Sequence, residues 1–265
     1  MTEARAEIGI VGGTGFYRFL EDAETVEVDT PFGAPSAAIS VGSVGERRVA
    51  FLPRHGVDHE FPPHGVPYRA NLWALKELGV VRVFGPCAAG SLRREVEPRT
   101  LVVCDQAVDF TKSRPTTFYE GPQVRHVSFA EPYCPTLREV LVKSAADAGI
   151  AHRDGGTMVV IEGPRFSTTA ESRMFSGLGC DVIGMTQFPE VTLARELEVC
   201  YATVALVTDY DVGVDDIQPV THEEVLKVFG ENIDRLRDLL GRAIPAVPEE
   251  RTCPCATALA GTGHG

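Results

Sequence analysis

The chain has 265 residues, is 44% hydrophobic and carries a formal net charge of −12 at pH 7. A chain of this length and composition can bury a sizeable core, which argues against global disorder, and its acidic balance argues against nucleic acid or an anionic membrane as a partner. The sequence contains no run of eighteen apolar residues, and MTEARAEIG at its start lacks the basic-then-apolar order of a signal peptide. A soluble cytoplasmic protein is expected.

Strand-like and helix-like patterns alternate along the chain and end at a long amphipathic helix. In chain order we expect a strand at 7–13, a hairpin at 37–56, a helix at 71–79, strands at 80–92 and 100–110, a helix at 136–149, a strand at 157–163, a helix at 168–179, a strand at 180–186, a helix at 188–198, a strand at 199–211 and a helix from 221. This order predicts a single-domain three-layer α/β/α sandwich around a central mixed, mostly parallel sheet, with one domain over 1–248.

The tail at 249–265 is expected to be flexible. It contains Cys253 and Cys255 as Cys-Pro-Cys, a spacing shorter than that of usual zinc knuckles, so a free polar tail is favoured and a redox clip stays open. The other five cysteines lie in apolar or strand-like surroundings, as Cys104 and Cys200 do, which is typical of reduced, buried thiols. We therefore expect no metal.

Short polar stretches follow several of the predicted strands, at the edge where open α/β sheets bind ligands. They are GGTG (12–15), PRHG (53–56), CAAGS (87–91), EGPRFST (162–168), GMTQFPE (184–190) and TDYD (208–211). The first lacks the third glycine of a dinucleotide fingerprint, and no phosphate loop with Gly-Lys-Ser/Thr occurs. A tight turn explains GGTG, and the alternative is an anion bound by backbone amides and the Thr14 hydroxyl.

The remaining stretches each have two interpretations. Arg54 and His55 suit a phosphate, although an arginine at a strand end often forms a surface salt bridge. Phe166 suits stacking on a flat ring, although core packing explains it equally. Asp209 and Asp211 are two apart on a strand and so share a face, which fits ligand binding, acid–base chemistry or a solvated loop. A metal there is disfavoured, because no HxH or HExxH pattern supplies further ligands.

Taken together, the motifs GIVGGTG, RHG, AAGSLR, EGPRFST, DVIGMTQFPEV and ALVTDYD, in this order over roughly residues 8 to 245, resemble the trimeric purine nucleoside phosphorylase and methylthioadenosine phosphorylase family. The resemblance implies that inorganic phosphate, as co-substrate, attacks C1′ of a purine nucleoside and releases the base, with no cofactor or metal. It is closest to methylthioadenosine phosphorylase, which implies S-methyl-5′-thioadenosine as substrate and adenine with 5-methylthioribose 1-phosphate as products.

The resemblance also assigns residues to a phosphate site. These are Thr14, Arg54, His55, the backbone near Ala88, and Thr186. Cys87 departs from the family, whose methylthioadenosine members usually carry threonine there, so a hydroxyl donor is lost. For the base, Asp209 and Asp211 match the residues that adenine-specific members aim at the N6 and N7 edge of the purine. Members that act on 6-oxopurines carry asparagine for Asp209 and glutamate for Ser167, so both positions favour adenine.

For the sugar, Met185 matches a residue that lies against the ribose, and Phe166 holds the nucleoside. The 5′ pocket of the family is matched by His222, Val225 and Leu226. At the position of His222, methylthioadenosine members carry an apolar residue, whereas 6-oxopurine members use a histidine to bind a 5′-hydroxyl. His126 matches a residue that a neighbouring subunit contributes, which implies a homotrimer or hexamer with shared active sites. A 6-oxopurine or methylthioinosine phosphorylase, a phosphorylase of another 5′-substituted adenosine, and a non-catalytic binding protein stay open; a metal-dependent nucleoside hydrolase and a NAD-binding dehydrogenase are disfavoured.

Overall fold

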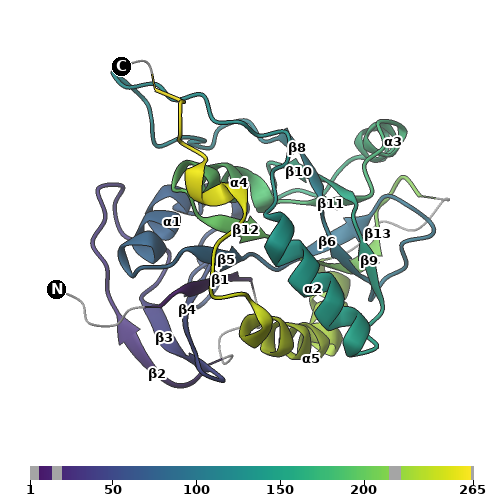
Figure 1. Cartoon of the computed structure of the whole chain (residues 1–265). Helices are drawn as coiled ribbons and strands as arrows, with labels where there is room; N and C mark the ends of the chain where they lie inside the picture. The colour runs from purple at the N-terminus through teal and green to yellow at the C-terminus, as the bar shows by residue number, and fades with distance from the viewer. Residues whose placement is uncertain (1–5, 14–19, 215–221, 264–265) are drawn as a thin grey trace.

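The structure, a computed structural model, describes residues 6–13, 20–214 and 222–263 (Figure 1). Within these residues the strands form two mixed sheets. The first has the order β12 (Cys200–Ala202), β5 (Arg82–Phe84), β1 (Ile8–Gly12), β4 (Arg47–Pro53), β3 (Ile39–Val44) and β2 (Glu21–Val26). The second has the order β8 (Gln106–Phe110), β10 (Thr157–Ile161), β11 (Val182–Gly184), β6 (Cys87–Ser91), β13 (Ala205–Tyr210), β7 (Leu101–Val103) and β9 (His152–Asp154).

The two sheets are linked because two segments, each expected to be one strand, are each divided between them. The segment 80–92 forms β5 in one sheet and β6 in the other, and 199–211 forms β12 and β13 in the same way. The break in the first falls at Gly85–Pro86, where proline has no N–H to continue the ladder. The two segments stay paired across this break, since the Gly85 N–H donates to Ala202 O at 2.9 Å and the Cys87 N–H donates to Val204 O at 3.1 Å. A third expected strand, 100–110, is also divided, but its two parts, β7 and β8, both lie in the second sheet.

Helices cover both faces of the first sheet, which makes the three layers visible in Figure 1. On one side lie α1 (Tyr68–Glu77) and α4 (Gln187–Glu196), which contact each other; on the other lie α2 (Pro135–Asp147) and α5 (His222–Ala246). The alternation of β1 serves both layers: Val11 joins the core beneath α1 and α4, whereas Ile8 and Ile10 join the core beneath α2 and α5. The predicted α/β sandwich with mixed, mostly parallel pairing is confirmed.

Helix α3 (Thr169–Gly177), which follows the EGPRFST stretch, begins with side-chain capping. The Thr168 hydroxyl accepts from Glu171 N–H, and the Glu171 carboxylate accepts from Thr168 N–H, which is a complete capping box. Thr168 therefore has a structural role, and the neighbouring Phe166 and Ser167 are left on the loop that precedes the helix.

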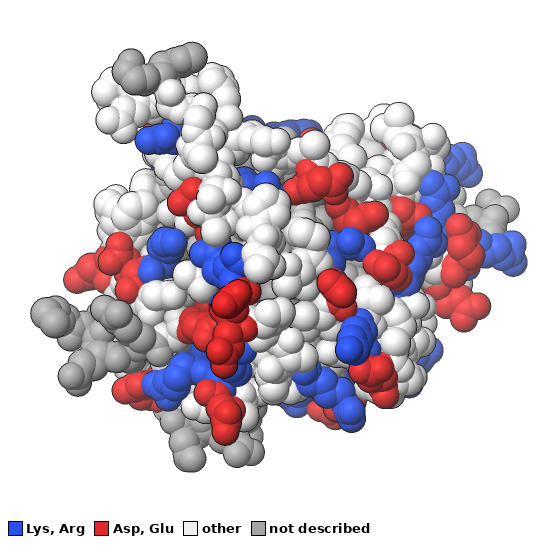
Figure 2. Space-filling model, in the orientation of Figure 1, with Lys and Arg blue, Asp and Glu red and all other residues white. Residues whose placement is uncertain are grey.

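The segment 249–263, for which a flexible tail is expected, packs against the body of the molecule. It contains the short helix η2 (Pro254–Thr257), and Cys255 is buried in the core beneath α2 and α5. None of the described helices is long and apolar enough to cross a membrane. On the face shown in Figure 2, acidic and basic side chains are interspersed over the described surface.

Candidate active site

A cavity of about 600 Å³ opens where the predicted polar stretches meet, a size typical of small-molecule sites. Its walls include residues that follow β1 and β4 and residues along β6. β1 and β4 run parallel, and their ends are joined by the Arg54 N–H, which donates to Gly12 O at 2.8 Å. Of the predicted site residues, the cavity is lined by Arg54, His55, Cys87, Ala88, Phe166, Ser167, Met185, Thr186, Asp209 and Asp211.

The other predicted residues are not brought to this cavity by the described structure. His126 is exposed and does not line it. Thr14 lies outside the described residues, as do the side chains of His222, Val225 and Leu226 at the start of α5. Their assigned roles therefore stay predictions.

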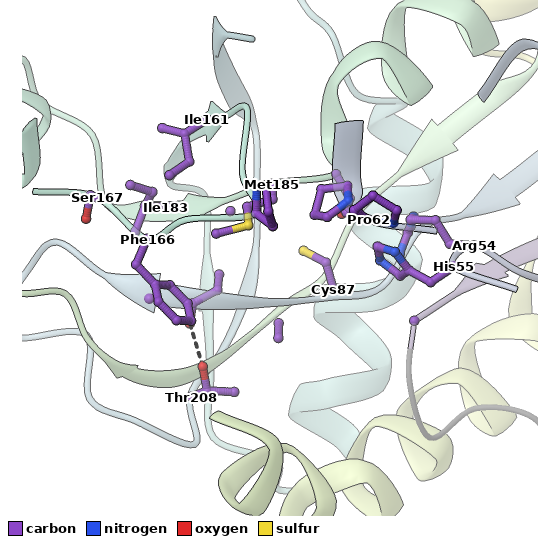
Figure 3. A pocket seen from close by; sticks show the side chains of 18 of the residues that line it. Arg54, His55, Pro62, Cys87, Ile161, Phe166, Ser167, Ile183, Met185 and Thr208 are labelled. Carbon is purple, nitrogen blue, oxygen red and sulfur yellow. Dashed lines mark hydrogen bonds between the residues drawn. The ribbon is translucent and has the colours of Figure 1, made fainter. Parts of the chain in front are cut away.

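Two groups of side chains occupy opposite ends of the cavity (Figure 3). Arg54 and His55 lie at one end, whereas Phe166 and Ser167 lie at the other, with Met185 between them. An elongated ligand with chemically different ends would fit such a site better than a single compact ion.

At the first end, Arg54 is held in a buried ion pair that the sequence did not indicate. Its Nε donates to Glu190 Oε1 at 2.5 Å and its Nη2 to Glu190 Oε2 at 2.9 Å, and the two side chains are 1% and 0% exposed. Further N–H groups donate to Val11 O and Pro86 O. One N–H of Nη1 has no hydrogen-bond partner among the described residues. Nη1 lies toward Gly13, since a Cβ atom added to that glycine would be 3.8 Å from it. Arg54 thus offers the cavity one donor and a charge already balanced by Glu190.

His55, next to it, is neutral at pH 7. Burial and the nearby Arg54 charge lower its pKa to about 4. Its Nδ1 lies 2.8 Å from Phe61 O; because a carbonyl only accepts, Nδ1 carries the proton and Nε2 has a free lone pair. His55 therefore presents an acceptor rather than a positive charge.

Cys87 and Thr186 also line the cavity. Burial raises the pKa of the Cys87 thiol, which keeps it neutral and unable to repel an anion. Its Sγ lies 3.9 Å from Thr203 Oγ1. Thr186 is the N-cap of α4, yet its side chain makes no capping hydrogen bond, so its hydroxyl remains for the cavity it lines.

At the other end, Asp209 and Asp211 both line the cavity, as their alternation predicts. A bulge in β13 between Val207 and Asp209 also turns Thr208 toward the cavity, where its hydroxyl donates to Asp209 Oδ1 at 2.5 Å. Ser167 lies within hydrogen-bond distance of both oxygens of Asp211, at 2.8 and 2.6 Å, and donates to that carboxylate. The two acids are thus each oriented by a neighbouring hydroxyl.

Arg114 joins the loops that carry Phe166 and Met185, a role that the sequence did not reveal. It is 6% exposed, and its guanidinium donates to Met185 O at 2.7 Å and to Glu162 O at 2.6 Å. It also donates to Phe188 O, at the start of α4. In TKSRPTT it looks like an ordinary loop arginine, and only the fold brings these carbonyls together.

Comparison with known proteins places this site in a family. Residues 7–245 match the phosphorylase superfamily. The chain is 53% identical to a purine nucleoside phosphorylase of Streptomyces coelicolor, covering 99% of this chain and 98% of that protein. It is 55% identical to an S-methyl-5′-thioadenosine phosphorylase of Thermococcus kodakarensis, covering 95% and 97%.

Solved structures agree with these sequence relatives. A methylthioadenosine phosphorylase from an antarctic soil metagenomic library matches with a TM-score of 0.93 at 39% identity, covering 99% of this chain and 93% of that one. The methylthioadenosine phosphorylase of Schistosoma mansoni, in complex with adenine, matches with a TM-score of 0.88 at 35% identity, covering 93% of each chain. The chain belongs to the purine nucleoside phosphorylase and methylthioadenosine phosphorylase family of the phosphorylase superfamily.

Proposed function

We propose that this protein cleaves S-methyl-5′-thioadenosine with inorganic phosphate and yields adenine and 5-methylthioribose 1-phosphate. The observation that carries the proposal is a cavity that has Phe166 and two hydroxyl-oriented carboxylates at one end and Arg54 at the other, with Thr186 in its lining. These ends suit a purine and an oxyanion, and the sugar would span the distance between them. The reaction requires no cofactor or metal.

At the base end, an ionised carboxylate accepts from the 6-amino group of adenine, and a protonated carboxyl donates to N7. We assign the second role to Asp209, because a donor at N7 neutralises the charge that builds on the departing base. The Ser167 hydroxyl holds Asp211 in place for the first. Phe166, 39% exposed in the single chain, has a ring face available to stack on the purine.

At the phosphate end, donors and acceptors are mixed. The remaining Nη1–H of Arg54 and the Thr186 hydroxyl would donate to phosphate oxygens, as would the backbone near Ala88. His55 Nε2 can only accept, so it would receive the P–OH hydrogen of a hydrogen phosphate ion and fix its orientation beneath C1′. Met185 would lie against the ribose as C1′ takes on oxocarbenium character.

A 6-oxopurine nucleoside or methylthioinosine phosphorylase is the second candidate. The similar Streptomyces coelicolor protein is named a purine nucleoside phosphorylase, and His222 resembles the residue with which 6-oxopurine members bind a 5′-hydroxyl. Asp209 and Ser167 oppose this candidate, because 6-oxopurine members carry asparagine and glutamate at these two positions. In addition, the ionised carboxylate of Asp211, placed here at the 6-position, would face O6 without a proton between them and be repelled, at a cost of roughly 1–3 kcal/mol or more.

We also infer a homotrimer or hexamer that works in the cytoplasm. The exposed position of His126, away from its own chain's cavity, is compatible with a contribution to a neighbouring subunit's site. The described cysteines are all free, as is usual in a reducing compartment.

The test is base release from methylthioadenosine, adenosine, inosine and methylthioinosine, each with and without phosphate. We expect phosphate-dependent release of adenine, fastest from methylthioadenosine. Release without phosphate would indicate a hydrolase, and a preference for inosine or methylthioinosine would overturn the base assignment.

A further inference from the structure

Four cysteines from three distant parts of the chain meet away from the active site. Cys134 is the N-cap of α2, Cys200 begins β12, and Cys253 and Cys255 lie at η2 in the C-terminal segment. Their sulfur atoms all lie within 4.8 Å of one another, and the Cys200 and Cys253 sulfurs are 3.3 Å apart. None of the four lines the cavity described above.

The spacing of these sulfurs matches a four-coordinate metal site. Zinc binds thiolates at about 2.3 Å in a tetrahedron, which separates neighbouring sulfurs by about 3.8 Å. A disulfide would require about 2.05 Å, and all seven cysteines are free in the described residues. The Cys-Pro-Cys spacing is shorter than that of a zinc knuckle, but it can supply two of four zinc ligands here, because Cys134 at α2 and Cys200 in β12 supply the other two.

A cation lies beside the four cysteines. The guanidinium of Arg251 is close enough to Cys200 to act on it through its charge. The buried Nε of Arg251 has no hydrogen-bond partner among the described residues. Four thiolates around a divalent ion carry a net charge of −2, which this cation would partly balance.

We propose that Cys134, Cys200, Cys253 and Cys255 form a structural site for zinc. Four protein ligands leave no open position for water or substrate, so the ion would hold the fold together rather than take part in catalysis. This site departs from the expectation that the protein binds no metal and that its tail is free.

The ion would fasten the C-terminal segment to α2 and β12. Beyond η2 the segment continues to Gly263, which forms a bridge with Arg125, the residue before His126. Fixing residues 253–255 therefore also limits the movement of the loop that carries His126. This consequence concerns loop position only, and the zinc site itself does not depend on the proposed reaction.

The test is metal analysis of the full-length protein, purified under reducing conditions, exposed to Zn²⁺ and desalted. We expect about one zinc per chain in the wild type and in the control C180S, which alters a buried cysteine outside the cluster, and a loss of bound zinc in C255S. With Co²⁺ in place of Zn²⁺, the wild type should show the strong visible absorption of tetrahedral cobalt–thiolate coordination, which needs no variant.

Two results would overturn the proposal. One is a wild type that retains no more zinc than C255S and gives no cobalt–thiolate spectrum. The other is direct alkylation in fresh lysate, followed by mass spectrometry, that finds these cysteines paired in disulfides. Phosphorolysis could persist in either case, so failure here is distinguishable from failure of the proposed function.

Discussion

Replacing Glu190 by glutamine keeps the shape of the side chain and removes the charge that faces the buried guanidinium of Arg54. The two groups meet through contacts of 2.5 and 2.9 Å at exposures of 1% and 0%. Unit charges about 4 Å apart interact by about 4 kcal/mol at an effective dielectric constant of 20, and breaking a buried pair from one side costs about 3–5 kcal/mol. In addition, the amide nitrogen of the glutamine would replace one of two acceptors facing the guanidinium.

We therefore expect Glu190→Gln to lower the free energy of unfolding by about 3–5 kcal/mol, measured by urea unfolding at fixed protein concentration. The matched control is Glu196→Gln on the same helix: Glu196 is 4% exposed and accepts from Thr117 Oγ1 and Phe118 N–H, with no cation paired to it in the described residues. Its loss should be about 1–2 kcal/mol, as for a buried hydrogen-bonded group.

Phosphate makes this experiment a test of the site as well as of stability. If phosphate binds beside Arg54, it can take the place of the missing carboxylate charge, so saturating phosphate should stabilise Glu190→Gln more than the wild type. A loss no larger than that of Glu196→Gln would refute the reasoning about the buried pair. An equal effect of phosphate on both proteins would refute the placement of the anion.

Three further predictions concern the same cavity. The pKa of His55 is lowered from 6.5 to about 4, so the unfolded state gains a proton as the pH falls from 6.5 to 4 while the folded state does not. The free energy of unfolding of the wild type should therefore fall by about 3 kcal/mol over that range relative to that of His55→Gln, as measured by urea titrations. Parallel pH profiles of the two proteins would contradict this. Asp209→Asn should lower kcat/KM for methylthioadenosine by about a hundredfold or more and raise the relative rate on inosine; unchanged relative rates would contradict the base assignment. Gly90→Ala would place a carbon 3.1 Å from Asp209 Oδ2 and should lower kcat/KM about tenfold or more, whereas Gly177→Ala, which meets nothing within 4 Å, should not.

Local patterns predicted much of this molecule. The alternation of apolar residues indicated the strands, and the position of polar residues at strand ends indicated the cavity, because parallel strands bring their carboxyl ends to one edge. The same alternation placed Asp209 and Asp211 together. These features depend on a few neighbouring residues, so a sequence can display them.

The features that were missed depend on contacts between distant segments. Glu190 looked like an ordinary acid in the first turn of a helix, and only the fold turns it toward Arg54, 136 residues away. Thr208 faces the cavity because of a bulge, and bulges shift the alternation without a clear signal in the sequence. Cys253 and Cys255 were interpreted without the ligands that α2 and β12 add.

The central claim is that a purine edge and a phosphate ion bind at opposite ends of one cavity, and a crystal structure of the protein soaked with adenine and phosphate tests it most directly. We predict the ring stacked on Phe166 with its N6 and N7 within hydrogen-bond distance of Asp211 and Asp209, and the phosphate beside Arg54, His55 and Thr186. A ring bound away from both aspartates, or a phosphate bound away from Arg54, would contradict the account.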